Sequence, residues 1–254
     1  MTLYIIGIGL SDEKDITAKG LEAVKKSDFV YLEVYTSLLQ VGIEKLERFY
    51  GRKKNEIIKA DRDLIENRPD EIIERAKKKD VSLLFVGDPL SATTHIDIMM
   101  RAKDKDVDVK VIFNASVLTA VGITGLQLYK FSKTTSIPFP ENVKSETAYD
   151  VIKQNQEGKM HTLVLLDLDP LKDKFMRVND AVEILLGIEK KRKEGIFTEE
   201  TLAVGCARLG SDGFIVKAGK AKDLIKFNFG SPPHCLIVPS GMHFMEEEAL
   251  QRFR

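Results

Sequence analysis

Three short segments combine glycine with polar side chains, and each directly follows an apolar run. They are Gly7-Ile8-Gly9-Leu10-Ser11-Asp12, then Gly87-Asp88-Pro89-Leu90-Ser91, and a third that begins at Asn114-Ala115-Ser116-Val117. If the apolar runs are parallel strands, these segments are turns at the carboxyl ends of the strands, where open sheets bind ligands. A carboxylate, hydroxyls and backbone groups in that place could bind a small polar ligand.

The first turn does not fit a dinucleotide. The dinucleotide fingerprint needs a third glycine where this chain has Asp12, and an aspartate there would repel a pyrophosphate. Two interpretations remain: the glycines simply end a strand, or the turn passes close to a ligand without phosphate chemistry.

The second and third turns each allow two interpretations. Pro89 forces the chain to leave the strand sharply. Asp88 then either accepts hydrogen bonds from nearby backbone amides or faces an amine or hydroxyl of a ligand. Small residues recur from 114 to 125, which indicates either a helix packed tightly on a sheet or close approach of the backbone to a bound cofactor.

Other patterns of catalytic chemistry are not found in the sequence. The four histidines show no i, i+4 pairing and no nearby cysteine pair, so we expect no metal site. Gly-x-Ser-x-Gly does not occur, and the stretch Gly213–Lys220 lacks the hydroxyl and spacing of a phosphate-binding loop. The lysine runs at 77–79 and 190–193 are typical of solvated helix ends.

The elements that position the turns alternate between strand and helix in the first half of the chain. Apolar runs predict strands, and amphipathic stretches with capping signals predict helices. Thr17 is expected to cap one helix, and Gly51 to end another. The predicted strands are Leu3–Ile8, Phe29–Leu32, Ile57-Ile58, Val81–Val86 and Val109–Phe113, and the predicted helices follow Thr17 and span Ser37–Tyr50, Pro69–Lys79 and Thr94–Lys103. This alternation implies βαβ units and a mainly parallel sheet.

The second half has a different pattern. Its helices are predicted at Leu118–Tyr129, Asp150–Glu157 and Val178–Lys193, and its strands at Thr162–Leu168, Leu202–Arg208, Phe214–Ala218 and Cys235–Val238. A glycine-rich turn between Arg208 and Phe214 predicts a hairpin, and so antiparallel pairing. We therefore expect two α/β domains, residues 1–113 with a parallel sheet and residues 114–254 with a mixed sheet, with a cofactor cleft between them.

Composition excludes several classes of protein. The chain has 254 residues, of which 43% are hydrophobic, and its 39 Lys and Arg balance 39 Asp and Glu. A zero balance disfavours nucleic-acid binding by bulk charge. No apolar run approaches the about 20 residues needed to cross a bilayer, and the first residues do not resemble a signal peptide, so no membrane association is expected. Cys206 and Cys235 lie in apolar runs, and two buried thiols suggest the reducing cytoplasm.

Taken together, the three turns resemble those of the diphthine synthases, a family within the tetrapyrrole-methylase class. The resemblance extends through most of the chain, and the Gly-Asp-Pro turn is common to the whole class. It is carried by residues 3–10 with 12–17, Tyr35-Thr36-Ser37-Leu38, Gly87-Asp88-Pro89-Leu90 with Ala92-Thr93-Thr94-His95, residues 120–125 with 129–131, and residues 230–239. Many tetrapyrrole methylases have Pro-Gly after the first Gly-x-Gly. Leu10-Ser11 stands there in this chain, which weighs against a porphyrinoid substrate.

The resemblance implies a cofactor and a set of contacts. The cofactor would be S-adenosylmethionine, bound folded between the domains and converted to S-adenosylhomocysteine, with no metal. The implied contacts are Leu10, Asp88, Ser91, Ser116, Val117, Leu166, Leu209 and His234. The four aliphatic side chains would form an apolar wall, Asp88 and Ser91 would contact polar ends of the cofactor, and His234 would border the adenine.

The resemblance also implies a substrate, translation elongation factor 2. The amine of its aminocarboxypropyl-modified histidine would be methylated, and the enzyme would be a homodimer. The amine must lose its proton before it attacks, to water or to a carboxylate, and the sequence identifies no general base. Three alternatives are a tetrapyrrole methylase of the same fold, a non-catalytic module that senses S-adenosylmethionine, and a nicotinamide oxidoreductase, which Asp12 disfavours.

Overall fold

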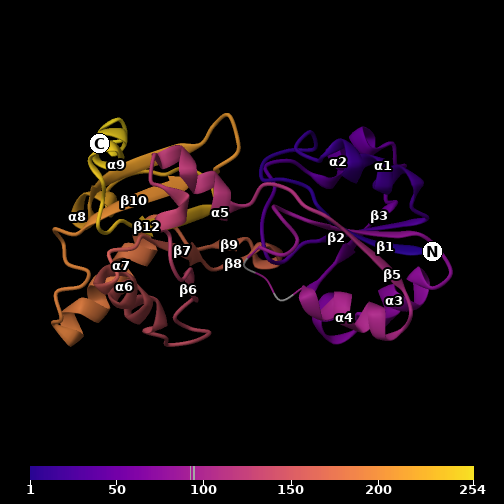
Figure 1. The fold of residues 1–254 in the computed structure, drawn as a ribbon, viewed down its shortest axis with the longest axis horizontal. Coiled ribbons are helices and arrows are strands. Elements are labelled where there is room, and N and C mark those ends of the chain that lie inside the picture. The colour runs from indigo at the N-terminus through magenta and orange to yellow at the C-terminus, as the bar shows by residue number, and fades with distance from the viewer. Residues whose placement is uncertain (92, 94) are drawn as a thin grey trace. The chain divides into compact units, whose positions relative to one another are not determined.

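The computed structural model describes residues 1–91, 93 and 95–254, which form two compact units (Figure 1). The first unit comprises Met1–Val117 with Pro170–Lys172, and the second comprises Leu118–Asp169 with Asp173–Arg254. The predicted division into domains at residues 113/114 remains our proposal for where the chain separates into independently folding parts.

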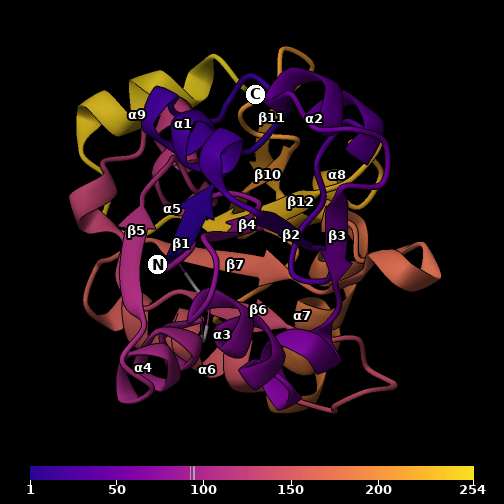
Figure 2. The same ribbon diagram turned by 90° about the vertical axis from the view of Figure 1, so that its right-hand side faces the viewer.

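The first unit contains a five-stranded sheet in which all strands are parallel. Its strands are β1 (Thr2–Gly7), β2 (Phe29–Glu33), β3 (Ile57–Ala60), β4 (Val81–Phe85) and β5 (Asp108–Ile112). Their order is β3-β2-β4-β1-β5, as Figure 2 shows across the view. The parallel sheet predicted from the apolar runs is confirmed.

Helices cover both faces of this sheet, which explains why its central strands are apolar along their whole length. One hydrophobic core joins the sheet to α1 (Ala18–Lys26) and α2 (Ile43–Tyr50), and another joins it to α3 (Asp70–Ala76) and α4 (Ile96–Asp104). A short π-helical turn, η1 (Asp63–Asn67), precedes α3.

The predicted helix ends are partly confirmed. Thr17 caps α1 by accepting a hydrogen bond from the Gly20 amide at 3.1 Å, and Gly51 ends α2 in the left-handed conformation with φ of 71°. The predicted start of α2 at Ser37 is wrong, because residues 37–42 form a loop in which the Gln40 amide donates to the Ser11 carbonyl at 2.9 Å. The predicted start of α4 at Thr94, like Ala92 of the quoted motif, lies outside the described residues.

The second unit contains a mixed five-stranded sheet, as predicted. Its strands are β6 (Thr135–Ile137), β7 (Thr162–Leu166), β10 (Leu202–Ala207), β11 (Ile215–Lys220) and β12 (His234–Val238). They lie in the order β11-β10-β12-β7-β6, and only β6 and β7 are parallel. The expected hairpin is formed by β10 and β11. A small hairpin of β8 (Leu168–Asp169) and β9 (Lys174–Phe175) encloses the turn η4 (Pro170–Lys172).

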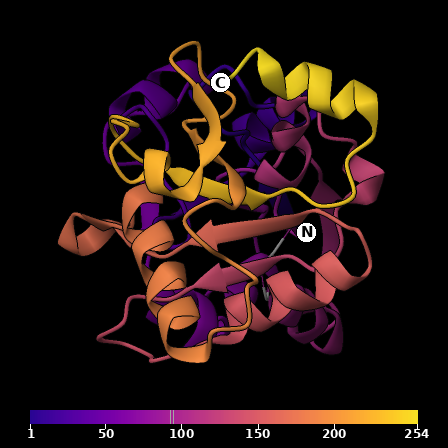
Figure 3. The same cartoon turned by 90° about the vertical axis from the view of Figure 1, so that its left-hand side faces the viewer.

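Three helices share the main core of the second unit: α6 (Thr147–Glu157), α7 (Val178–Arg192) and α8 (Ala221–Leu224). The last helix, α9 (Phe244–Gln251), lies away from α6 and α7 (Figure 3). At its end, the Phe253 carbonyl accepts a hydrogen bond of 2.8 Å from the amide of Ala218 on the edge strand β11.

The long helix predicted over Leu118–Tyr129 is wrong. The segment forms α5 (Val117–Ala120) and two 3-10 turns, η2 (Val121–Thr124) and η3 (Leu128–Lys130). Gly125 breaks the helix because its φ is 82°, and because α9 packs on it so closely that a Cβ on Gly125 would lie 2.2 Å from the Cβ of Ala249.

A buried carboxylate anchors α9. Glu246 accepts hydrogen bonds from the amides of Gln127 at 2.9 Å and His243 at 2.7 Å, from Lys130 Nζ at 2.5 Å and from His161 Nε2 at 2.8 Å. Burial by itself would raise its pKa, but these four donors outweigh burial and hold the pKa of Glu246 at about 2. The charge of Glu246 is therefore part of the fold.

The two cysteines are buried and free, as expected, and they are partners in the register of β10 and β12. The contact with Cys235 and burial raise the pKa of the Cys206 thiol. Within the described residues, no helix is long and apolar enough to cross a membrane.

Candidate functional site

The predicted turns meet at the carboxyl edge of the first sheet. The amide of Gly87 donates to the carbonyl of Gly9 at 2.7 Å, and the amide of Gly9 donates to the carbonyl of Gly87 at 3.3 Å. A Cβ placed on Gly87 would lie 3.7 Å from Leu10 Cδ2 and 3.9 Å from Ser116 Cα. Gly87 is therefore the point at which the turns after β1, β4 and β5 converge.

Asp15 fixes the first turn. Its Oδ2 accepts hydrogen bonds from the amides of Leu10 at 3.1 Å and Ser11 at 2.7 Å. Gly9, with φ of 82°, packs on Asp15 so closely that a Cβ on Gly9 would lie 2.2 Å from the Cβ of Asp15. The two amides that a phosphate-binding loop would offer to an anion are thus occupied by a carboxylate of the chain.

Asp88 joins the second and third turns. Its Oδ1 accepts from the Leu90 amide at 3.0 Å and from the Ser91 hydroxyl at 3.1 Å, and its Oδ2 accepts from the Asn114 amide at 3.1 Å. Of the two interpretations of Asp88, the structure shows the backbone-bracing one directly. The same three bonds fix the position of Ser91.

Asn114 connects the third turn to the first. Its Nδ2 donates to the carbonyls of Gly7 and Asp15, each at 3.0 Å, and its Oδ1 accepts from the Ala115 amide at 2.7 Å. Ser116, which follows, is buried. Neither Asn114 nor Asp15 was assigned a role from the sequence. The signal that could have identified Asn114 is that it is the first polar residue after its strand.

Glu33 braces the turn after β2 in the same way. It accepts from the amides of Tyr35 at 2.5 Å and Thr36 at 2.7 Å and from the Thr36 hydroxyl. Its side chain is buried, and this burial outweighs the donors and raises its pKa. Glu33 was also missed, although Tyr35 and Thr36 belong to a quoted motif.

His95 packs against the second turn and the end of β4. Its ring packs on Phe85 with 4.0 Å between the ring centroids, and its Nδ1 lies 3.2 Å from the Pro89 carbonyl. Because that carbonyl can only accept, Nδ1 carries the proton. Burial lowers the pKa of His95, so the ring is neutral at pH 7.

The three predicted residues of the second unit lie at one end of its sheet. Ala207 is the register partner of His234, and Cys235 is the partner of Leu165. The end of β7, the end of β10 and the start of β12 are therefore adjacent, which brings Leu166, Leu209 and His234 to the same edge. Leu166 and Leu209 are buried.

His234 is held by the backbone on both ring nitrogens. Its Nδ1 accepts from the Val178 amide at 3.4 Å, and its Nε2 donates to the Ser231 carbonyl at 3.1 Å. Burial lowers its pKa, so His234 is a neutral ring with a fixed tautomer at pH 7.

Arg208 braces the loops around this edge. It has φ of 51°, and its guanidinium donates to the carbonyls of Phe229 at 3.0 Å, Gly213 at 2.9 Å and Ser231. From the sequence, Arg208 was predicted only as the end of a strand, with no role of its own. Gly213 lies within the predicted turn, but Phe229 and Ser231 lie 21 and 23 residues away, too far for spacing to reveal them.

Comparison with known proteins identifies the family. The family model of the tetrapyrrole (corrin/porphyrin) methylases matches residues 2–225. Diphthine synthase of Methanocaldococcus jannaschii is 47% identical over 253 residues, which cover 98% of this chain and 97% of the relative. The chain belongs to the diphthine synthases. It is therefore a methyltransferase of diphthamide biosynthesis.

Further diphthine synthase relatives agree. Diphthine methyl ester synthase of Dictyostelium discoideum is 44% identical over 272 residues, covering 100% of this chain and 98% of the relative. A crystal structure of diphthine synthase superposes with a TM-score of 0.90 at 40% identity, covering 100% of this chain and 96% of the other. The expected fold and enzyme class are confirmed.

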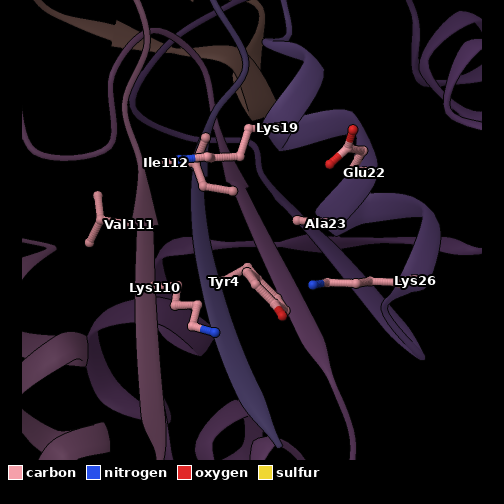
Figure 4. Close-up of a pocket in the computed structure, with 8 residues that line it drawn as sticks. All are labelled: Tyr4, Lys19, Glu22, Ala23, Lys26, Lys110, Val111 and Ile112. Carbon is pink, nitrogen blue, oxygen red and sulfur yellow. The ribbon is translucent and has the colours of Figure 1, made fainter.

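A separate cavity of about 400 Å³ in the first unit lies between α1 and the edge strand β5 (Figure 4). It is lined by Lys19, Lys26 and Lys110 against one carboxylate, Glu22, and by none of the eight predicted residues. Lys26 Nζ lies 4.6 Å from the centroid of the Tyr4 ring, and a hydrogen bond with Tyr4 raises the pKa of Lys26. A cavity with this charge disfavours a cationic methyl donor, so it is not our candidate for the diphthine synthase site.

No group of three or more His, Cys, Asp or Glu is placed to hold a metal ion in the described part of the chain. The eight predicted cofactor residues thus lie at two sheet edges, one in each unit: Leu10, Asp88, Ser91, Ser116 and Val117 in the first, and Leu166, Leu209 and His234 in the second.

Proposed function

We propose that the chain binds S-adenosylmethionine through these eight residues and methylates the aminocarboxypropyl-modified histidine of translation elongation factor 2. The observation that carries the cofactor assignment is the occupation of the turn amides by carboxylates. Asp15, Glu33 and Asp88 each accept backbone N–H groups at the carboxyl edge of the first sheet.

This arrangement selects for the charge of the ligand. Free amides at a strand end attract phosphate, whereas amides paired with carboxylates do not. The remaining field of Asp15 and Asp88 favours a cation, and S-adenosylmethionine carries a sulfonium and an ammonium. The proposal therefore agrees with the exclusion of a dinucleotide by Asp12.

Gly87 lies where the first and third turns approach each other. A Cβ there would make ordinary van der Waals contacts with Leu10 Cδ2 at 3.7 Å and Ser116 Cα at 3.9 Å, whereas a Cβ on Gly7 would meet the Gly87 carbonyl oxygen at 2.5 Å. Two of the eight residues, Leu10 and Ser116, are therefore close to the same point of the backbone.

Each predicted residue has a role in the proposal. Leu10, Val117, Leu166 and Leu209 supply apolar surface for the adenine and the methionine chain. Asp88 positions Ser91 and the turn backbone, and Ser91 and Ser116 offer polar groups to the cofactor. His234, neutral and fixed, borders the adenine.

The chemistry requires little of the protein beyond positioning. Bound S-adenosylmethionine would supply an activated methyl group. The acceptor must present a neutral amine, because an ammonium has no lone pair, and the apolar side chains would exclude water from it. Asp88 already accepts three hydrogen bonds, so we assign it to bracing and name no general base.

A second product is possible on the evidence of the relatives' names. The relatives from Dictyostelium discoideum and Arabidopsis thaliana are diphthine methyl ester synthases, whereas those from the methanogens are diphthine synthases. A methyl ester forms when the acceptor is the carboxylate of the same side chain. Our first proposal is methylation of the amine, and ester formation is the second candidate.

We also propose a cytoplasmic homodimer, from the family resemblance and from the two free, buried thiols, which suit a reducing compartment. Light scattering of the purified protein tests the dimer directly.

The proposed function is tested by mass spectrometry of elongation factor 2 that bears the unmethylated precursor, after incubation with the protein and S-adenosylmethionine. We expect stepwise methyl additions confined to the modified histidine. Mild alkali distinguishes the products, since it removes an ester methyl and leaves methyls on nitrogen. Binding of the cofactor without any mass change would contradict the substrate assignment and favour a tetrapyrrole methylase or a sensor.

A further inference from the structure

The second unit has an open groove of about 490 Å³ between the β8–β9 hairpin, the loop after β6 and α7. Its apolar surface includes Phe139, Met176 and the half-buried Ile184. We call it the hairpin groove. None of the eight predicted cofactor residues lines it.

The hairpin groove is acidic. Glu141, Asp180 and Glu183 line it, against one ammonium, that of Lys174. Asp180 pairs with Arg177 at 3.2 Å, and Glu141 pairs with Lys174, whereas the exposed Glu183 forms no ion pair with any other described residue. The groove thus keeps negative charge for a positive partner.

One cation of the chain, the ammonium of Lys174, already binds in the groove. Lys174 Nζ lies 4.0 Å from the centroid of the Phe139 ring while it pairs with Glu141. An ammonium between an aromatic face and a carboxylate is a favourable arrangement. Lys174 already occupies these two groups, so the carboxylate that a basic side chain from another molecule would meet is that of Glu183.

Three hydrogen bonds connect the groove and the start of α7 to the candidate site. The Met176 amide donates to the Asp167 carbonyl at 3.0 Å, and the Phe139 amide donates to Asp167 Oδ2 at 2.8 Å. Asp167 directly follows Leu166. At the start of α7, the Val178 amide donates to His234 at 3.4 Å. A molecule in the groove would therefore lie next to the edge that carries Leu166 and His234.

We propose that the hairpin groove docks a segment of the protein substrate that presents a basic side chain beside an apolar one. This inference rests on the proposed function and specifies where the protein substrate binds. Carboxylates on the groove disfavour nucleic acid and acidic lipid, and its apolar floor suits a side chain of a protein.

The test compares Glu183→Lys and Ile184→Asn with a matched control, Glu199→Lys, which reverses an exposed charge of the same unit outside the groove. Methylation of precursor-bearing elongation factor 2 gives KM and kcat, and calorimetry gives the Kd of S-adenosylmethionine. We expect Glu183→Lys and Ile184→Asn to raise KM about tenfold, with kcat and cofactor Kd within about twofold of wild type. Glu199→Lys should match wild type.

The salt dependence of KM completes the test. The wild-type KM should rise with salt, and that of Glu183→Lys should depend on salt less. An unchanged KM in both groove variants, with active wild type, would overturn the docking proposal and leave the proposed function intact. No methylation by wild type would overturn both. Circular dichroism of each variant, with the retained cofactor Kd, shows that the variants are folded.

Discussion

The two sheet edges that carry the predicted cofactor residues are braced by side chains of opposite character. In the first unit, Asp15, Glu33 and Asp88 accept hydrogen bonds from backbone amides. In the second unit, Arg208 and His234 donate to backbone carbonyls. The first edge thus pairs several of its amides with carboxylates, and the second pairs several of its carbonyls with a guanidinium and an imidazole, although Asn114 also donates in the first and His234 also accepts in the second.

The difference shows that bracing residues help to choose the ligand. A turn whose amides are occupied by carboxylates cannot bind phosphate through those amides, even when its glycines suggest a phosphate loop. An edge whose carbonyls are occupied by a guanidinium offers chiefly apolar contact, and Leu166 and Leu209 supply it. Residues that never touch a ligand can therefore determine its charge.

Among substitutions at the edge of the first unit's sheet, Asp88→Ala should weaken cofactor binding the most. It leaves the amides of Leu90 and Asn114 without their acceptor and uncouples two turns. We expect the Kd of S-adenosylmethionine to rise about 100-fold and the free energy of unfolding to fall by about 2 kcal/mol. Calorimetry and urea unfolding measure both. The control is Asp12→Ala in the first turn, because the Asp12 side chain accepts a hydrogen bond from the exposed amide of Lys14. Equal affinities of the two variants for S-adenosylmethionine would refute a bracing role for Asp88.

Two buried carboxylates, Glu246 and Glu33, have pKa values shifted in opposite directions, so they stabilise the fold in different pH ranges. Glu246 of the second unit has a pKa of about 2, so its stabilising contribution is present above its ordinary value of 4.5 and is lost as the pH falls from 4.5 towards 2. Glu33 of the first unit has a raised pKa, so its contribution is fully present below 4.5 and falls as the pH rises through its folded pKa.

Substitution by glutamine should therefore separate these two carboxylates. At pH 7, Glu246→Gln should lower the free energy of unfolding by about 3 kcal/mol, because Lys130 loses its charged partner, whereas Glu33→Gln should lower it by less, because burial disfavours the charged form of Glu33 and raises its pKa. Urea unfolding at pH 7 and pH 4 measures the difference. Equal losses of unfolding free energy for both variants would show that burial does not disfavour the charged form of Glu33.

The second edge should be less sensitive than the first. Arg208→Met removes the donors to Phe229, Gly213 and Ser231, and we expect the Kd of the cofactor to rise about tenfold. Arg177→Met is the control, since Arg177 forms an exposed ion pair with Asp180. A Kd for Arg208→Met that matches this control would place the cofactor contacts outside the reach of these loops.

The smallest effect should come from Ser91→Ala. Asp88 loses one of three donors and keeps the amides of Leu90 and Asn114, so the Kd should rise less than about fivefold. Calorimetry beside Asp88→Ala checks the order of the two. A larger loss for Ser91→Ala than for Asp88→Ala would contradict the larger role that we give to the bracing by Asp88.

Local patterns predicted much of the fold. The apolar runs gave the parallel sheet, Thr17 and Gly51 gave helix ends, and the glycine-rich turn gave the β10–β11 hairpin. Local patterns could not reveal β6, which has three residues, or α9, which buries only Glu246 and Leu250. The helix predicted over 118–129 failed because Gly125 adapts to α9, which is distant in the sequence.

The candidate site was likewise predicted in part, where its residues follow a local pattern. Turns after strands could be found from spacing, so Leu10, Asp88 and Ser116 were selected. Their partners depend on tertiary structure: Asp88 binds the amide of Asn114, 26 residues away, and Arg208 binds the carbonyl of Ser231, 23 residues away. A sequence pattern contains no trace of such pairs, which explains why Asn114 and Arg208 were missed. Asp15 was missed although the amides that it accepts from are only four and five residues away.

The bond from the Ala218 amide to the Phe253 carbonyl has a practical consequence. β11 is an edge strand, and an unpaired edge is a template for strand-to-strand aggregation. The backbone of Phe253 occupies one position of that edge. Displacing Phe253 from β11 would expose this position and favour precipitation.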